Sequence, residues 1–169
     1  MSGMTQFVAQ GPSRRGRDST APPHRPDTGY RARFPARRSY AALDLGTNNC
    51  RMLIARPDGD QFFIVDAFSR IVRLGEGLGA SGRLSEAAMD RAVSALSICA
   101  DKLMRRNVHL ARSVATEACR RAANGAEFVD RVYRETGIKL DVIPAEEEAR
   151  LAVVGCHRLL EEGDGPALV

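Results

Sequence analysis

The stretch from Tyr40 to Arg56, which reads YAALDLGTNNCRMLIAR, decides the fold. Its apolar ends predict two short strands, over 40–45 and 50–55, and the polar residues 46–49 between them predict a tight turn. Glycine adopts positive φ at no steric cost, and asparagine tolerates the left-handed region better than most residues. A turn of this composition can aim several backbone N–H groups at one point, which is the geometry of an anion-binding concavity.

Asp44 stands near the end of the first expected strand. A carboxylate buried there needs a partner or a metal ion, because burying a charge without one is costly. Asp44 could hold a hydrated Mg²⁺, and the hydroxyl and amide side chains of the turn add hydrogen-bond donors. The plain alternative is an ordinary hairpin with polar turn residues, and the spacing alone favours neither interpretation.

The 169 residues favour one domain, and their net charge of +4 is unevenly distributed. Residues 1–39 hold eight arginines and two aspartates, whereas the remainder holds 17 basic and 19 acidic residues. Five of the eight prolines also fall in 1–39, and no periodic pattern survives there, so we expect a disordered basic arm. Its arginines could bind a polyanion, but without a recognition motif we favour a solvated tail over nucleic-acid binding.

Four cysteines, at positions 50, 99, 119 and 156, show no C-x-x-C spacing and stand in apolar or helical contexts. This usage is typical of reduced thiols in an intracellular protein. No apolar run approaches the roughly 20 residues that a membrane span needs, and the N-terminus lacks the apolar segment of a signal peptide. We therefore expect a cytoplasmic protein without a membrane partner.

Helical and strand patterns alternate behind the first hairpin. The order βββαβαβα predicts an α/β fold, with a mixed sheet that begins as an antiparallel meander and carries flanking helices. Ser85 is expected to cap the long helix, and Phe128, Val132 and Tyr133 to face inward from a later one. The further expected elements are strand 61–68 continuing toward 74, loop 75–83, helix 86–106, strand 110–115, a short helix within 116–123, helix 126–136 ended by Gly137, strand 139–143, helix 145–162 and the start of a strand at 167–169.

Three segments are expected at the ends of sheet strands, where ligands bind in open α/β folds. They are the turn after Asp44, residues 116–120 after the fourth strand, and residues 146–150 after the fifth. The three glutamates at 146–148 have an ordinary explanation, because acids in the first turn of a helix complement its dipole. Arg120, beside Arg121, would likewise be a solvated surface charge in most helices.

Three segments also resemble a known family. Asp44 to Asn48 resembles the first phosphate loop of the actin-like ATPase superfamily, and the continuation to Cys50 resembles its exopolyphosphatase/guanosine pentaphosphate phosphatase (Ppx/GppA) branch. Asn49 stands where that branch usually has serine. Residues 115–120 resemble the family's strand-to-helix segment, and residues 144–151 resemble the segment that carries its catalytic glutamate.

This resemblance implies a ribonuclease-H-like half-domain over 40–169, the N-terminal lobe of a longer protein whose second lobe and second phosphate loop would follow Val169. It implies that Glu148 is the catalytic base and that Arg120 contacts substrate phosphate, since a guanidinium suits bidentate phosphate contact. Asp44 and Glu148 would hold Mg²⁺. The further phosphate-binding positions are Gly46, Thr47, Asn48, Asn49 and Cys50.

The function that the resemblance implies is hydrolysis of terminal phosphoanhydride bonds by a Mg²⁺-assisted water. The substrate would be inorganic polyphosphate or guanosine pentaphosphate, and the sequence does not choose between them. Two alternatives stay open: another kinase or ATPase of the actin-like superfamily, and a non-catalytic lobe that binds polyanions. A homodimer also stays open, because the sequence sets no oligomeric state.

Overall fold

The computed structural model describes residues 5–6, 38–59 and 61–156. Its strands are β1 (Thr5–Gln6), β2 (Ser39–Leu45), β3 (Asn49–Asp58), β4 (Gln61–Ile71), β5 (Val108–Ala115) and β6 (Asp141–Val142). Its helices are α1 (Leu78–Ser81), α2 (Glu86–Arg105), α3 (Glu117–Arg121), α4 (Gly125–Thr136) and α5 (Ala145–Cys156). Among these described helices, none has both the length and the apolar composition needed to cross a membrane.

The sheet is mixed, as the order of elements predicted. Its path is β1-β5-β2-β3-β4. The short strand β6 is off this path and pairs with the end of β5, on the edge away from β2. β2, β3 and β4 form an antiparallel meander, and β5 then returns beside β2 in a parallel pairing. β6 extends the sheet in parallel beside β5. The α/β class, the mixed sheet and the flanking helices are therefore confirmed.

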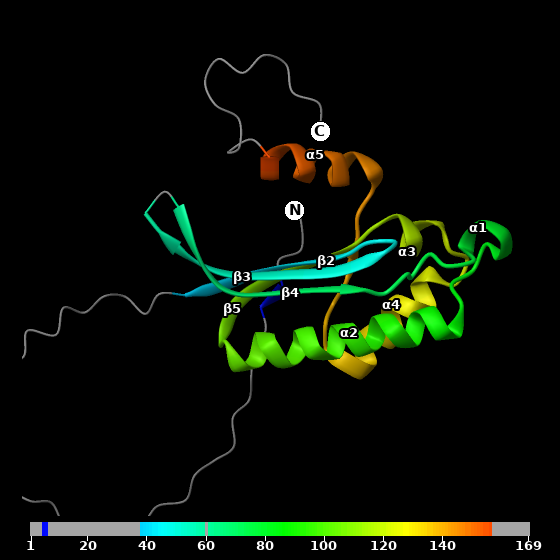
Figure 1. Ribbon diagram of the computed structural model, residues 1–169, viewed down its shortest axis with the longest axis horizontal. Helices are drawn as coiled ribbons and strands as arrows, with labels where there is room; N and C mark the ends of the chain where they lie inside the picture. The colour runs from blue at the N-terminus through cyan, green and yellow to red at the C-terminus, as the bar shows by residue number, and fades with distance from the viewer. Residues whose placement is uncertain (1–4, 7–37, 60, 157–169) are drawn as a thin grey trace, which may run out of the picture.

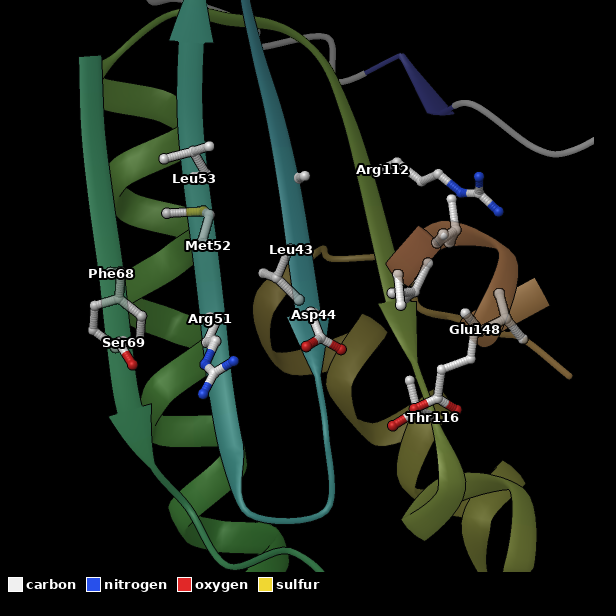
Figure 2. Close-up of a pocket in the computed structure, with 15 residues that line it drawn as sticks. Leu43, Asp44, Arg51, Met52, Leu53, Phe68, Ser69, Arg112, Thr116 and Glu148 are labelled. Carbon is white, nitrogen blue, oxygen red and sulfur yellow. The ribbon is translucent and has the colours of Figure 1, made fainter. Parts of the chain in front are cut away.

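Alternating residues divide the sheet into a closed face and an open face. On the closed face, Leu43 of β2 and Met52 and Ile54 of β3 are buried in the core. Helices α2 and α4 lie on this side and α5 lies on the opposite side (Figure 1). The open face carries Asp44 on β2 and Arg51 directly opposite it on β3 (Figure 2). The period-2 pattern thus separates the core from the residues that could meet a ligand.

Helix α2 packs against the closed face of the sheet, and it begins where the sequence predicted. Ser85 caps it in an extended conformation, and its side chain accepts a hydrogen bond from the Ala88 N–H at 3.3 Å. Near its other end, Lys102 and Arg106 bind Asp66 of β4 at 2.8 and 2.9 Å. These two cations lower the pKa of Asp66 to about 2. The helix is thereby tied to the sheet by charge as well as by apolar burial.

The structure differs from the sequence expectations at four places. Thr5–Gln6, inside the expected basic arm, pairs with β5, although two residues are too few to show a periodic pattern. The expected loop 75–83 contains the short helix α1, with Gly77 and Gly82 at its ends at φ 77° and 66°. The fifth expected strand shrinks to Asp141–Val142. Tyr133 is 59% exposed, so the prediction that it faces inward was wrong.

Other expectations fall on residues that the structure does not describe. These are the rest of the basic arm up to 37 and the final apolar segment 167–169. The last helix is described only as far as Cys156, so its predicted extension to 162 also lies outside the described residues.

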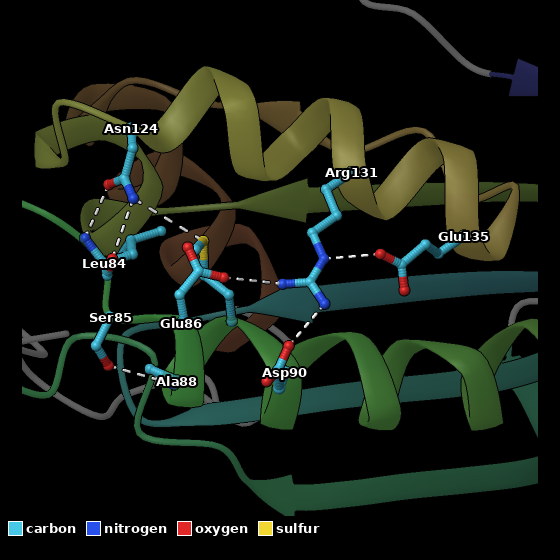
Figure 3. A network of polar contacts seen from close by, with 9 residues as sticks. Leu84, Ser85, Glu86, Ala88, Asp90, Asn124, Arg131 and Glu135 are labelled. Atoms are coloured by element: carbon cyan, nitrogen blue, oxygen red, sulfur yellow. Dashed lines mark hydrogen bonds and ion pairs between the residues drawn. The ribbon is translucent and has the colours of Figure 1, made fainter.

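Two polar networks join α4 to α2 and to the residue that precedes its cap (Figure 3). Asn124, which is 4% exposed, accepts a hydrogen bond from the Leu84 N–H at 2.8 Å and donates to the Leu84 carbonyl at 3.0 Å. Arg131 of α4 binds Asp90 of α2 at 2.6 Å and Glu135 at 2.7 Å. One amide side chain therefore satisfies both backbone groups of Leu84, where the chain enters α2.

We predict that Asn124→Ala destabilises the protein more than Ser85→Ala does. The first change leaves a buried donor and a buried acceptor without their partner, at about 1–3 kcal/mol for each group. The second removes one helix cap, at about 1 kcal/mol. Urea unfolding followed by circular dichroism measures both, and an equal or smaller loss at Asn124 would contradict the role assigned to it.

Candidate functional site

A cavity of about 750 Å³ lies between the open face of the sheet and α5. Apolar residues line part of its wall: Ala42, Leu53 and Val114 come from the sheet, and Leu151 comes from the helix. The polar residues that line it come from five elements and the residue before α3, and Figure 2 shows them around the cavity. They are Asp44, Arg51, Ser69, Arg112, Thr116 and Glu148.

Two predicted site carboxylates, Asp44 and Glu148, line the same cavity and lie at the same end of it (Figure 2). The surrounding protein desolvates Asp44, which raises its pKa, and the like charge of Glu148 raises that pKa further. Arg51 acts in the opposite direction but does not cancel these two effects. The negative charges therefore repel each other across a space that a cation could occupy.

Arg120 and Glu148 also come together, although 28 positions separate them in the chain. Both terminal nitrogens of Arg120 lie 3.4 Å from Oε2 of Glu148. One of them also donates to the Ile143 carbonyl at 2.6 Å, just before α5 begins. The structure thus joins two of the three strand-end segments that the sequence singled out.

The polar turn 46–49 is held against the chain that follows β4. The Gly46 N–H donates to the Asn49 carbonyl at 2.9 Å, and this hydrogen bond closes the turn. The Asn48 carbonyl accepts from the N–H groups of residues 72 and 73, at 2.8 and 3.0 Å, and the Thr47 carbonyl accepts from that of Gly75 at 3.0 Å. The turn is therefore fixed by its own carbonyls, and it adjoins the cavity through Asp44.

Two expectations about this turn need correction. Neither Gly46 nor the two asparagines adopts positive φ, because the Gly46–Asn49 hydrogen bond closes the turn without it. Cys50, predicted as a phosphate ligand, has its side chain fully buried on the closed face, where the neighbouring Cys99 thiol and burial raise its pKa. The Cys50 thiol therefore cannot reach a phosphate in the cavity, and only its backbone could serve that prediction.

Sequence reasoning missed three polar residues of the cavity, and it gave no role to a fourth, Thr116, although it placed residues 116–120 at the end of a strand. Arg51 could have been found, because it lies opposite Asp44 in a hairpin that the sequence predicted. Arg112 could not, because it depends on the parallel register that sets it beside Ala42 of β2. Ser69 depends on the register between β3 and β4, which the local pattern does not specify.

The three glutamates of α5 have three different environments. Glu147 binds Arg150 through two contacts at 2.7 and 2.9 Å and Arg112 at 3.2 Å. These arginines lower the pKa of Glu147 to about 2. Glu146 is exposed, whereas Glu148 faces Arg120 and the cavity. Glu146 is therefore the glutamate that is best explained by the helix dipole alone.

The donor set fits Mg²⁺ better than a metal that needs a full protein cage. Over the described ranges of the chain, no group of three or more His, Cys, Asp or Glu side chains is placed to hold a metal ion. Mg²⁺ usually takes one or two carboxylates and completes its shell with water and substrate phosphates. Asp44 and Glu148 could supply such a pair, and a cation between them would offset the desolvation and the like charge that together raise the pKa of Asp44.

Comparisons with known proteins agree on one family. Residues 53–169 match the model of the Ppx/GppA phosphatase family. The chain is 38% identical over 123 residues to the guanosine-5'-triphosphate,3'-diphosphate pyrophosphatase of Photobacterium profundum. Among solved structures, it is similar to an Aquifex aeolicus Ppx/GppA family member at 33% identity and a TM-score of 0.67. It is also similar to an exopolyphosphatase from Cytophaga hutchinsonii, at 30% identity and a TM-score of 0.65.

These relatives are longer than the chain. The match with the Photobacterium profundum protein takes 73% of this chain but 25% of that one. The match with the Aquifex aeolicus protein covers 70% of this chain and 39% of that one. The match with the Cytophaga hutchinsonii protein covers 68% of this chain and 36% of that one. The chain therefore spans about a quarter of the first relative and well under half of each solved chain.

We predict that Gly75→Ala displaces the polar turn and that Thr47→Ser rescues it. A Cβ on Gly75 would collide with the Cγ2 methyl of Thr47, while the next atom, Thr47 Cβ, is 3.7 Å away. Overpacking of this kind costs about 1–3 kcal/mol. Serine lacks that methyl, so the double variant should recover most of the lost stability.

Urea unfolding of the two single variants and the double variant measures this rescue, and the NMR shift of the Asn48 amide reports the displacement of the turn. Equal losses in the Gly75→Ala variant and the double variant would show that the methyl is not the obstacle.

Proposed function

This chain belongs to the Ppx/GppA phosphatase family, and we propose that it is the N-terminal lobe of a phosphohydrolase that cleaves terminal phosphoanhydride bonds. The substrate would be inorganic polyphosphate or guanosine pentaphosphate. The observation that carries the proposal is the contact of Arg120 with Glu148 at a cavity that Asp44 also lines. A phosphate-binding cation, a carboxylate that can orient water and a second carboxylate then meet in one place.

Glu148 would orient the attacking water and accept its proton. Its Oε2 lies 3.4 Å from both terminal nitrogens of Arg120, so a bound phosphate would compete with Glu148 for the same guanidinium. A guanidinium presents two parallel donors to phosphate oxygens and stabilises the charge that spreads over them in the transition state. Arg120 is kept in place meanwhile by its hydrogen bond to the Ile143 carbonyl at 2.6 Å.

Asp44 and Glu148 would hold Mg²⁺. The ion, when bound, would neutralise negative charge on the phosphate oxygens and help to activate water. The polar turn after Asp44 would contribute phosphate contacts through the backbone of residues 46–50 and the side chains of Thr47, Asn48 and Asn49. Its anchoring to residues 72–75 supports this role, because a phosphate site requires a turn of fixed shape.

A second lobe would complete the site from the other side of the substrate. The partial coverage of the relatives supports this, since most of their length has no counterpart in these residues. The four unpaired cysteines support an intracellular, cytoplasmic location.

We predict that residues 1–169 alone hydrolyse polyphosphate and guanosine pentaphosphate slowly compared with a chain that also carries the second lobe. The reason is that the open cavity cannot exclude water or close around the phosphates. Phosphate release per folded molecule, with and without Mg²⁺, measures the difference. Equal turnover by the two proteins would show that the second lobe is not needed.

We predict that Glu148→Gln lowers kcat by about 10²–10⁴-fold, with little change in KM or in stability. Glutamine keeps the shape and can still accept a hydrogen bond, but it loses the charge that orients and deprotonates water. The measurement is steady-state phosphate release by a chain that carries both lobes.

Glu146→Gln is the matched control, because Glu146 is an exposed acid in the same first turn. Glu147→Gln is not a neutral control, since Glu147 binds two arginines. Equal, small effects at Glu146 and Glu148 would mean that Glu148 only complements the helix dipole, and its assignment as the base would be withdrawn.

A further inference from the structure

The helix that carries Glu148 is held differently from the other long helices. α2 and α4 each bury several apolar side chains, whereas α5 has no buried residue over its described length. Figure 1 shows α5 on its own side of the sheet, joined to the rest by the segment after β6. Apolar burial therefore does little to fix α5, in which Leu151 is at most half-buried, and the polar contacts of its first turn contribute more to its position.

Those contacts are polar and reach two different elements. Glu147 binds Arg112 of β5 at 3.2 Å, and Glu148 binds Arg120 of α3 at 3.4 Å. Asp141 of β6 lies 3.9 Å from the same Arg112 nitrogen and adds a weaker contact. The Arg112 and Glu147 side chains are only 25% and 23% exposed, so water and salt screen this pair less than a surface pair.

We propose that Arg112 and Glu147 are positioning residues, which fix the first turn of α5 on β5 and so set where Glu148 stands in the cavity. This inference rests on the proposed function. Neighbouring residues of a helix point roughly 100° apart, so two anchors at 147 and 148 fix the rotation of the helix about its axis as well as its location. One anchor alone would leave that rotation free.

The two anchors would not be equivalent during the reaction. A phosphate bound by Arg120 draws the guanidinium away from Glu148 and weakens that anchor. Arg112 contacts Glu147, which is not one of the proposed phosphate ligands, so phosphate bound at Arg120 does not compete for this contact. Arg150 keeps the Glu147 carboxylate oriented toward Arg112 from within α5, through its contacts at 2.7 and 2.9 Å. The Arg112–Glu147 pair thus holds the base in place when Arg120 is occupied.

The test is a double-mutant cycle of Arg112→Gln and Glu147→Gln in a chain that carries both lobes. Each single change should lower kcat about 10–100-fold at nearly constant KM, because an error of about 1 Å in placing a catalytic group costs that much. The double variant should lose no more than the worse single variant, since both remove the same interaction. Arg112→Lys, which keeps the charge, should recover part of the loss.

Amide hydrogen exchange of residues 148–154 is the second readout, and it does not depend on activity. It should quicken at least tenfold in both single variants, while α2 stays protected. Arg131→Gln is the matched control, because Arg131 is a similarly half-buried arginine that joins α2 to α4 through carboxylates. This control should lower stability but leave kcat and the exchange of α5 unchanged.

The outcomes separate the two ideas. Unchanged kcat per folded molecule, or losses that add in the double variant, would overturn the positioning role. If the unmodified protein hydrolyses neither polyphosphate nor guanosine pentaphosphate, the proposed function fails, and the exchange of α5 alone then decides whether the pair positions the helix. Faster exchange would uphold that placement, and unchanged exchange would overturn it.

Discussion

The parallel pairing of β2 with β5 is the constraint on which the site depends. It sets Asp44 beside Val114 and Leu45 beside Ala115, so both strands end at the same edge of the sheet. The Thr116 N–H then donates to the Leu45 carbonyl at 3.2 Å, and the Ile143 N–H to the Ala115 carbonyl at 3.1 Å. The chain leaves the sheet toward α3 and α5 from neighbouring points. For this reason Asp44 and Glu148 line one cavity and Arg120 contacts Glu148, whatever their separation in sequence.

The closed face explains why the open face can be polar. Leu43, Met52 and Ile54 are buried on the α2 side of the sheet, and with the apolar stripe of the helix they form one continuous core. That burial holds β2 and β3 in register, since a slip by one residue would turn the buried set toward solvent. The same register places Asp44 and Arg51 on the opposite face. The fold can therefore carry charges there that a core would exclude.

The sequence predicts what depends on local pattern and misses what depends on pairing between distant strands. The hairpin of β2 and β3, the cap at Ser85 and the end of α4 at Gly137 follow from periodicity and turn chemistry. Tyr133 misleads because it lies next to Val132, which is buried, while a helix turns about 100° between neighbours. Cys50 misleads because the family motif runs along the chain, whereas a strand points alternate side chains to opposite faces.

Helix α5 shows how the two kinds of information combine. The glutamates at 146–148 all suit the positive end of a helix, so the dipole cannot tell them apart. Their partners distinguish them, because Arg112 of β5 binds Glu147 and Arg120 of α3 binds Glu148. The far end of α5 still exposes Val153 and Val154, at 52% and 58%, so apolar packing does not set the helix's direction. Helix α5 is held by ion pairs at its first turn and has no buried residue along its described length, so its first turn is its best-fixed part. Glu148, the proposed base, sits in that turn, so its position depends on the arginines that surround the turn.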